Sequence, residues 1–254
     1  MKVVSIVSMK GGVGKTSLAA NLACALTLKL GPNRVVALDL DPQNALQWHF
    51  GLADHDVGGI CQQALSGSSL HNIAFKNAGE LVFFPYGFAD EPSRLAFESI
   101  LTLQPDWLKL QLDNLALAND ALVLIDTPPG PSPYLLQAIA CSDLAIIVLL
   151  PDAASYATVP AMETYLDEMI PINPDLQSAY VLNQLDESDS LGSDMARTLR
   201  QHLGERFASV LINSDEALRE ALALQQSVLD YDPHGQASHD VNALAAWLMG
   251  TLSR

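Results

Sequence analysis

Basic residues are scarce in this sequence. Its 254 residues include 13 Lys and Arg against 29 Asp and Glu, which gives a formal net charge of −16 at pH 7 and a pI near 4.5. A molecule of this charge repels nucleic acid and anionic lipid at long range. We therefore expect non-specific binding of DNA or of an anionic membrane to be disfavoured, unless a local basic patch overcomes the overall charge.

Cysteine is also rare. The chain has three: Cys24, Cys61 and Cys141. They lie far apart without C-x-x-C spacing, which gives little support to a disulfide framework, a zinc site or an iron–sulfur cluster and fits a reducing cytosol. The six histidines lack metal-binding spacing as well. Three of them are expected at the surface: His55, His71 and His202.

No apolar stretch approaches the roughly 18 consecutive residues of a membrane-spanning helix. The N-terminal apolar run is broken by Ser5 and Ser8 and leads straight into a glycine-rich turn, unlike a secretory signal. The last segment, 243–254, carries one basic residue, Arg254. A basic amphipathic membrane anchor is therefore not expected there.

Apolar strand-length segments alternate with helical patterns along the chain. We expect strands at 3–8, 34–40, 80–85, 121–125, 144–150, 178–182 and 210–212. We expect helices at 16–30, 92–103, 106–117, 134–142, 155–169, 215–224 and 238–252, with a further helix after an acidic loop at 186–194. Apolar strands between amphipathic helices are typical of a parallel sheet that is covered on both faces. Because no composition shift marks a linker, we predict a single α/β domain, residues 1–254, with a mostly parallel sheet flanked by helices on both faces.

A glycine-rich turn stands between the first strand and the first helix. It reads Lys10-Gly11-Gly12-Val13-Gly14-Lys15-Thr16-Ser17. Backbone N–H groups of such a turn close around oxyanions, and the helix N-terminus adds positive potential. Lys15 would contact the β- and γ-phosphates of a nucleotide, and the Thr16 hydroxyl would reach Mg²⁺. The alternative, a turn with two incidental lysines, leaves Gly11, Gly12 and Gly14 unexplained together.

The turn departs from the common pattern G-x-x-x-x-G-K-[ST], because Met9 stands where the first glycine belongs. With Lys10 at its entrance, the variant K-G-G-x-G-K-[ST] resembles the deviant Walker A loop of the MinD/ParA family of ATPases. The resemblance implies a P-loop ATPase fold, ATP and Mg²⁺ as cofactors, and an ATP-dependent homodimer. In that family the entrance lysine reaches the partner's phosphates across a face-to-face dimer, which implies a catalytic role for Lys10 in trans. Phosphate contact within one chain is the alternative.

Asp126 follows the apolar strand 121–125, which is the setting of a Walker B carboxylate. Beside Thr16 it would hold Mg²⁺ through water, since this ion keeps much of its hydration shell. The alternative is an aspartate that caps the turn before Pro128. On the first interpretation, segment 127–130 senses the γ-phosphate, and the backbone N–H of Gly130 donates to it only when ATP is bound.

Asp39 and Asp41 stand at the end of the second strand. Two residues apart on a strand, they would face the same side, at the edge of a parallel sheet where ligands bind. Asp-x-Asp-Pro-Gln resembles switch I of ParA-type proteins. The resemblance implies that Asp41 activates the attacking water and that Asp39 belongs to the Mg²⁺ shell. A solvated loop is the alternative.

Asn183 follows the strand 178–182, and its amide offers the donor and acceptor that suit an adenine edge. In the family an asparagine in this place contacts the base. Tyr231-Asp232-Pro233 resembles the family's late base-packing loop, which implies that Tyr231 and Pro233 pack against the base. No N-K-x-D guanine signature is present, so ATP is favoured over GTP.

Three branches of the family compete. MinD-type members carry the basic membrane helix that segment 243–254 does not resemble. ParA-type members bind DNA through surface arginines, for which the candidates here are Arg197, Arg200, Arg206 and Arg219. The cellulose-biosynthesis branch (BcsQ, also YhjQ) is most similar, in segment 211–228 and in compact length. This resemblance implies a cytoplasmic regulator that docks through protein partners, including a small helical subunit, onto an inner-membrane cellulose synthase complex.

Two kinds of activity remain open. The first is a switch that hydrolyses ATP in each cycle, which Lys10, Lys15 and Asp41 favour. The second is an ATP-locked dimeric scaffold with negligible turnover. Partitioning of a plasmid, chromosome or other cargo remains the alternative function.

Overall fold

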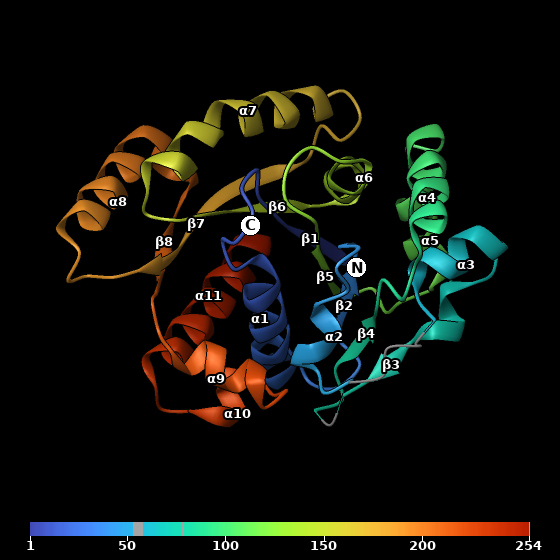
Figure 1. Cartoon of the computed structure of the whole chain (residues 1–254), viewed down its shortest axis with the longest axis horizontal. Coiled ribbons are helices and arrows are strands. Elements are labelled where there is room, and N and C mark those ends of the chain that lie inside the picture. Colours follow the sequence, from blue (N-terminus) through green and yellow to red (C-terminus); the bar gives the residue numbers. More distant parts are fainter. Residues whose placement is uncertain (53–57, 78, 254) are drawn as a thin grey trace.

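One eight-stranded sheet organises the protein (Figure 1). The computed structural model describes residues 1–52, 58–77 and 79–253. The strand order is β3-β4-β2-β5-β1-β6-β7-β8, and neighbouring strands are parallel except for β3 with β4. The strands are β1 (Lys2–Val7), β2 (Val35–Asp39), β3 (Phe75–Lys76), β4 (Val82–Phe84), β5 (Leu122–Asp126), β6 (Leu144–Leu149), β7 (Gln177–Leu185) and β8 (Phe207–Asn213).

Helices cover both faces of this sheet. One face carries α1 (Lys15–Leu30), α2 (Leu46–His49), α9 (Ala217–Ala223), α10 (Val228–Tyr231) and α11 (Gln236–Leu252). The other carries α3 (Ile60–Ser66), α4 (Glu91–Leu103), α5 (Trp107–Asn114), α6 (Pro133–Cys141), α7 (Ala153–Met169) and α8 (Ser190–Leu203). Two 3₁₀ turns are η1 (Leu70–Ile73) and η2 (Gly204–Arg206). The predicted fold class, α/β with a mostly parallel sheet flanked by helices on both faces, is confirmed.

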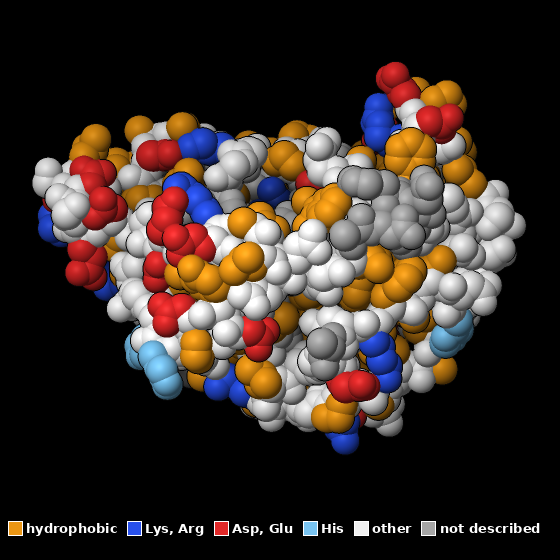
Figure 2. Space-filling view, turned by 60° about the horizontal axis from the view of Figure 1, so that its bottom comes forward, with side chains coloured by type: hydrophobic (Ala, Val, Ile, Leu, Met, Phe, Trp, Pro, Cys, Tyr) orange, Lys and Arg blue, Asp and Glu red, His pale blue; other side chains and the backbone are white. Residues whose placement is uncertain are grey.

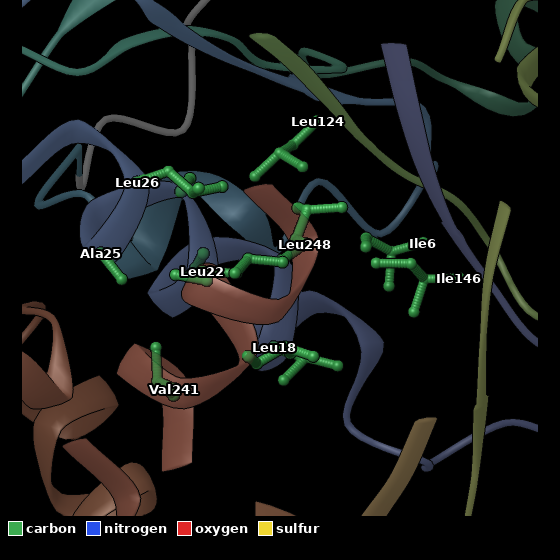
Figure 3. Close-up of a cluster of buried hydrophobic side chains, with 14 of the residues drawn as sticks. Ile6, Leu18, Leu22, Ala25, Leu26, Leu124, Ile146, Val241 and Leu248 are labelled. Carbon is green, nitrogen blue, oxygen red and sulfur yellow. The ribbon is translucent and has the colours of Figure 1, made fainter. Parts of the chain in front are cut away.

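The core around α1 fixes the helix that begins at the glycine-rich turn. Leu18, Leu22 and Leu26 recur every four residues and pack against the sheet and α11 (Figure 3). Leu22 and Leu26 are fully buried. Burying a leucine side chain contributes about 1.5–3 kcal/mol, so this stripe holds the N-terminus of α1 firmly against the central strands.

Strand β1 lies between β5 and β6, and β5 lies between β1 and β2. The parallel direction therefore brings the segments that follow β1, β2 and β5 to one edge of the sheet. Asp39 of β2 lies opposite Asp126 of β5 in the register. The strand order and register therefore place Asp39 and Asp126 side by side at the carboxyl edge of the sheet.

Some element boundaries differ from the sequence expectations. Strand β7 continues past Asn183 to Leu185, because Leu185 pairs with Asn213 of β8, and β8 is a full strand rather than the short 210–212. Helix α8 begins inside the expected acidic loop, since the Asp189 side chain caps it by accepting from the Leu191 N–H. The segment 45–80, for which no strand or helix is expected from the sequence, contains α2, α3, η1 and β3.

The histidines expected at the surface are exposed at His71 and His202, whereas His55 lies outside the described residues, as does Arg254. None of the described helices combines the length and apolar character needed to cross a bilayer.

Candidate nucleotide-binding site

The glycine-rich turn forms an open cradle after β1. Gly12 and Gly14 take positive φ angles of 75° and 83°, which L side chains rarely adopt. A Cβ on Gly14 would also lie 2.5 Å from the Asn183 amide nitrogen. That amide donates to the Val13 carbonyl at 2.8 Å. The structure therefore brings the end of β7 directly against the turn, and glycine is required where they meet.

Lys15 is buried at the first position of α1, with 6% of its surface exposed. Its ammonium donates to the Ser8 hydroxyl at 2.9 Å, and that hydroxyl donates to the Lys10 carbonyl at 2.7 Å. Burial lowers the pKa of Lys15, while the charges of Asp126 and Asp41 oppose the shift. Ser8, which the sequence analysis did not select, thus holds the lysine that is predicted to contact phosphate.

Asp126 is fully buried at the end of β5, and neither carboxylate oxygen has a partner in regular hydrogen-bond geometry among the described residues, although the Thr16 hydroxyl and the Thr127 N–H lie near it. Burial raises its pKa from 3.8 to about 7, although the nearby Thr16 hydroxyl and Lys15 charge favour the ionised form. A buried carboxylate without partners is costly, and a cation removes that cost. The Asp126 oxygens therefore fit a metal ion beside Thr16.

Asp39 has a different environment, although it is equally buried and its pKa is also raised by burial and by Asp126. Its two oxygens accept the backbone N–H groups of Asp41 and Leu46, at 2.9 and 3.1 Å. It thereby shapes the loop between β2 and α2. Its assignment to the Mg²⁺ shell stays a prediction, and Asp126 is the carboxylate with oxygens free for a metal.

Asp41 lies in that loop and is nearly buried, with 8% exposed. Its side chain accepts from the Gln43 N–H at 2.9 Å, and its carbonyl accepts from the Asn44 N–H at 2.8 Å. These bonds fix the carboxylate close enough to Lys15 for its charge to affect the pKa of the lysine. The predicted role of Asp41 in water activation is compatible with this position and stays a prediction.

The entrance lysine, Lys10, is bound within its own chain. Its ammonium donates to Asp152 at 2.5 Å, in an ion pair whose side chains are 30% and 41% exposed. Asp152 also caps α7 by accepting from the Ser155 N–H. Action in trans therefore requires Lys10 to leave Asp152.

The segment after Asp126 is bonded to β1. The Gly130 N–H donates to the Ser8 carbonyl at 2.9 Å, and the Thr127 hydroxyl donates to the Ile6 carbonyl at 2.8 Å. The N–H that was predicted to reach a γ-phosphate is thus already bonded, and it would have to exchange partners.

Asn183 lies near the end of β7, and Tyr231 and Pro233 lie at and just after the end of α10; their contact with a base stays a prediction. Asn183 is 4% exposed, and its amide oxygen has no partner among the described residues. A hollow of about 280 Å³ lies at the ends of β7 and β8, lined by Leu185, Asp186, Glu187, Asn213, Ser214 and Gln236. Neither Tyr231 nor Pro233 lines it; Tyr231 ends α10, and its hydroxyl donates to Glu220. The rule that ligands bind at the carboxyl ends of parallel strands could have selected Asn213 and Ser214.

The four candidate arginines do not form an unpaired basic patch. Three of them pair with acidic side chains, in Arg197–Asp194, Arg206–Glu163 and Arg219–Glu216, at 2.6–2.9 Å. The guanidinium of Arg200 lies over the Phe207 ring, 5.3 Å from its centre. On the face shown in Figure 2, Lys and Arg side chains are scattered among acidic ones.

Comparisons with known proteins show the family of this chain. A family model described as "Cellulose biosynthesis protein BcsQ" matches residues 1–249. BcsQ of Salmonella typhimurium is 25% identical, over 98% of this chain and 94% of its own. The chromosome-partitioning ATPase Soj of Thermus thermophilus is 28% identical, over 97% and 94%.

Among solved structures, the septum site-determining protein MinD of Pyrococcus horikoshii, complexed with Mg-ADP, has the same fold. Its TM-score is 0.77 at 21% identity, with 96% of this chain and 94% of that chain covered. The family match spans nearly the whole sequence, and the similar proteins include the partitioning ATPase Soj and MinD. The chain therefore belongs to the BcsQ family of cellulose biosynthesis proteins, within the MinD/ParA group of deviant Walker A ATPases.

Proposed function

We propose that this protein binds and hydrolyses Mg·ATP as a dimeric switch that regulates or localises a bacterial cellulose synthase secretion complex. The observation that carries the nucleotide part is Asp126, with two buried oxygens that lack partners beside the turn that holds Lys15 and Thr16. The family match over residues 1–249 supports the cellulose part.

The phosphates would be held by backbone N–H groups of the glycine-rich turn, by Lys15 and by Ser17. Thr16 and Asp126 would hold Mg²⁺, with Asp39 behind them, and the ion would neutralise charge on the phosphates. In the described residues no group of three or more His, Cys, Asp and Glu gathers as a metal site, which agrees with an ion that is held largely by phosphates and water. Asn183 would bind the adenine edge, with Tyr231 and Pro233 proposed to pack near the base.

Hydrolysis would depend on positions and charges, because phosphoryl transfer needs little covalent help. Asp41 would orient the attacking water. Lys10, once released from Asp152, would contact the phosphates of the second copy and stabilise negative charge in the transition state. Gly130 would exchange the Ser8 carbonyl for the γ-phosphate, so the segment after β5 would differ between the ATP and ADP states.

The variant Asp41→Ala tests this assignment, with exposed Asp113→Ala as its control. We expect the first variant to bind Mg·ATP and to stay dimeric by light scattering, with hydrolysis reduced by at least about 100-fold, while the control matches the wild type. Equal turnover in Asp41→Ala would sink the assignment of the water-orienting group. A wild type that binds ATP and dimerises without turnover would indicate an ATP-locked scaffold.

The partner is tested by capture from the native cell with the Asp41→Ala protein in ATP. We expect a cellulose synthase subunit and a small helical protein, at the cytoplasmic side of the inner membrane. Recovery of a centromere-binding or cell-division protein would redirect the assignment.

Cargo partitioning is the second candidate, because Soj is as similar to this chain as the BcsQ relative is. Firm ATP-dependent DNA binding at low salt that Arg197→Ala and Arg219→Ala abolish would favour it. The pairing of both arginines with acidic neighbours leads us to expect none.

A further inference from the structure

A buried histidine lies beside the phosphate-binding helix. His49 ends α2 and is 4% exposed, and its Nε2 lies 3.4 Å from the Ser17 hydroxyl of α1. Burial lowers the pKa of His49 to about 4, so the ring is neutral near pH 7. The sequence analysis gave this residue no role.

The contact closes a loop that carries Asp41. At the start of this loop, the Asp39 carboxylate accepts the Asp41 and Leu46 N–H groups. In the middle, the Asn44 side chain accepts from the Gly87 N–H at 3.2 Å. At the end, His49 meets Ser17. The last of these contacts therefore attaches the segment 39–49 to Ser17, the residue next to Thr16.

Packing on that side of α2 is incomplete. A hollow of about 390 Å³ is lined by Thr16, Ser17, Ala45, Trp48, His49, Leu222, Ala223 and Gln225. Because open space lies between α2, the start of α1 and α9, side-chain packing restrains α2 less there than in the core. The His49–Ser17 hydrogen bond lies beside this space and joins α2 to the start of α1.

The chemistry of phosphate gives this bond a direction. A phosphate oxygen only accepts hydrogen bonds, so Ser17 must donate its single proton to it. The Ser17 oxygen then accepts from His49, whose neutral ring carries a proton on Nε2 in one tautomer. A chain from His49 through Ser17 to phosphate forms only when nucleotide is bound, and hydrogen bonds in such chains strengthen one another.

We propose that His49 is a positioning residue that couples phosphate binding at Ser17 to the placement of Asp41 for hydrolysis. The inference rests on the proposed ATPase function and deepens it. His49 acts through Ser17 and the loop 39–49, without touching the reacting atoms.

Three variants separate the hydrogen bond from ring shape. His49→Gln keeps a donor near the position of Nε2, and His49→Phe keeps a ring of similar size without it. His71→Gln is the matched control, because His71 is exposed and its ring is hydrogen-bonded to the Asn114 carbonyl, away from Ser17. Thermal unfolding midpoints first confirm that each protein is folded.

Two measurements are then made. In steady-state hydrolysis we expect His49→Phe to lower kcat about tenfold with KM for ATP within about twofold, the pattern of an interaction made in the transition state. In fluorescence, Trp48 of α2 reports the movement of that helix when Mg²⁺ and a non-hydrolysable ATP analogue are added, with Trp48→Phe as the background. We expect His49→Gln and His71→Gln to keep both properties and His49→Phe to lose the fluorescence response.

The outcomes separate the two proposals. Wild-type kcat and response in His49→Phe would overturn the inference, and so would equal impairment in the Gln and Phe variants. If the wild type binds the analogue without turning over ATP, hydrolysis fails as the proposed function. In that case the Trp48 fluorescence response tests the coupling. A wild-type response that His49→Phe abolishes would support the coupling, and the absence of a response in the wild type would contradict it. Should His49→Phe not fold, Ser17→Ala replaces it and must abolish the response.

Discussion

The carboxylate of Asp126 gives the sharpest prediction, because it combines full burial with two oxygens that lack partners. Its pKa is raised from 3.8 to about 7. The folded, ligand-free protein therefore binds this proton more tightly than the unfolded chain does. Stability from this group is fully present below the unfolded pKa and is lost as the pH rises through the folded value.

The magnitude follows from linkage at about 1.36 kcal/mol per pH unit. The ionisation cost is about 2 kcal/mol at about pH 5.5 and about 4 kcal/mol at about pH 8. The variant Asp126→Asn removes this cost, although the buried amide that it introduces costs about 1–3 kcal/mol of its own. We expect the variant to gain about 2 kcal/mol in free energy of unfolding relative to the wild type between about pH 5.5 and pH 8.

Urea titrations at both pH values measure this difference, and Asp113→Asn, at an exposed site, should stay within about 0.5 kcal/mol of the wild type. Bound Mg·ATP changes the free energy of unfolding in the opposite direction. Mg·ATP at about 100 times its dissociation constant should stabilise the wild type by about 2.7 kcal/mol, and the Mg²⁺-dependent part should be absent in Asp126→Asn. An unchanged pH dependence, or full Mg²⁺-dependent stabilisation in the variant, would refute the assignment of Asp126 to the metal.

Two further predictions concern Lys10 and His49. Asp152→Asn keeps an α7 cap but removes the charge that binds Lys10. Dimerisation of this variant, measured by sedimentation, should require less ATP, and its free energy of unfolding should change by less than about 1 kcal/mol. An unchanged ATP requirement would argue against an ion pair between Lys10 and Asp152 that restrains dimerisation. Because burial lowers the pKa of His49 to about 4, the unfolded state binds its proton first as the pH falls. The free energy of unfolding should therefore keep its full His49 contribution above about pH 6.5 and lose about 2 kcal/mol of it at about pH 5. In urea titrations, His49→Gln should lower the dependence of the free energy of unfolding on pH in this range. An equal dependence in the variant and the wild type would contradict the buried neutral ring.

Local patterns predicted the parts of the site that lie on regular elements. The glycine-rich turn, the strand that ends at Asp126 and the Leu18–Leu22–Leu26 stripe each carry a short-range signal that the parallel sheet preserves. The meeting of Asp39 with Asp126 follows from the strand order, in which β2 lies beside β5, and the sequence analysis did not predict that order.

Long-range contacts could not be predicted in this way. The Lys10–Asp152 and His49–Ser17 contacts join residues 142 and 32 positions apart, and no periodicity encodes them. Likewise, the resemblance of 231–233 to a loop did not reveal that Tyr231 ends a short helix capped by Ser227, or that its hydroxyl donates to Glu220.

The central claim is that ATP brings two copies together through this site. Light scattering of the wild type and of Lys10→Ala, each with Mg·ATP and with Mg·ADP, tests it most directly. We predict that the wild type has twice the mass of the 27.3 kDa chain with Mg·ATP but not with Mg·ADP. Lys10→Ala should stay at the monomer mass with both nucleotides. A wild type with the same mass in both nucleotides would contradict the account.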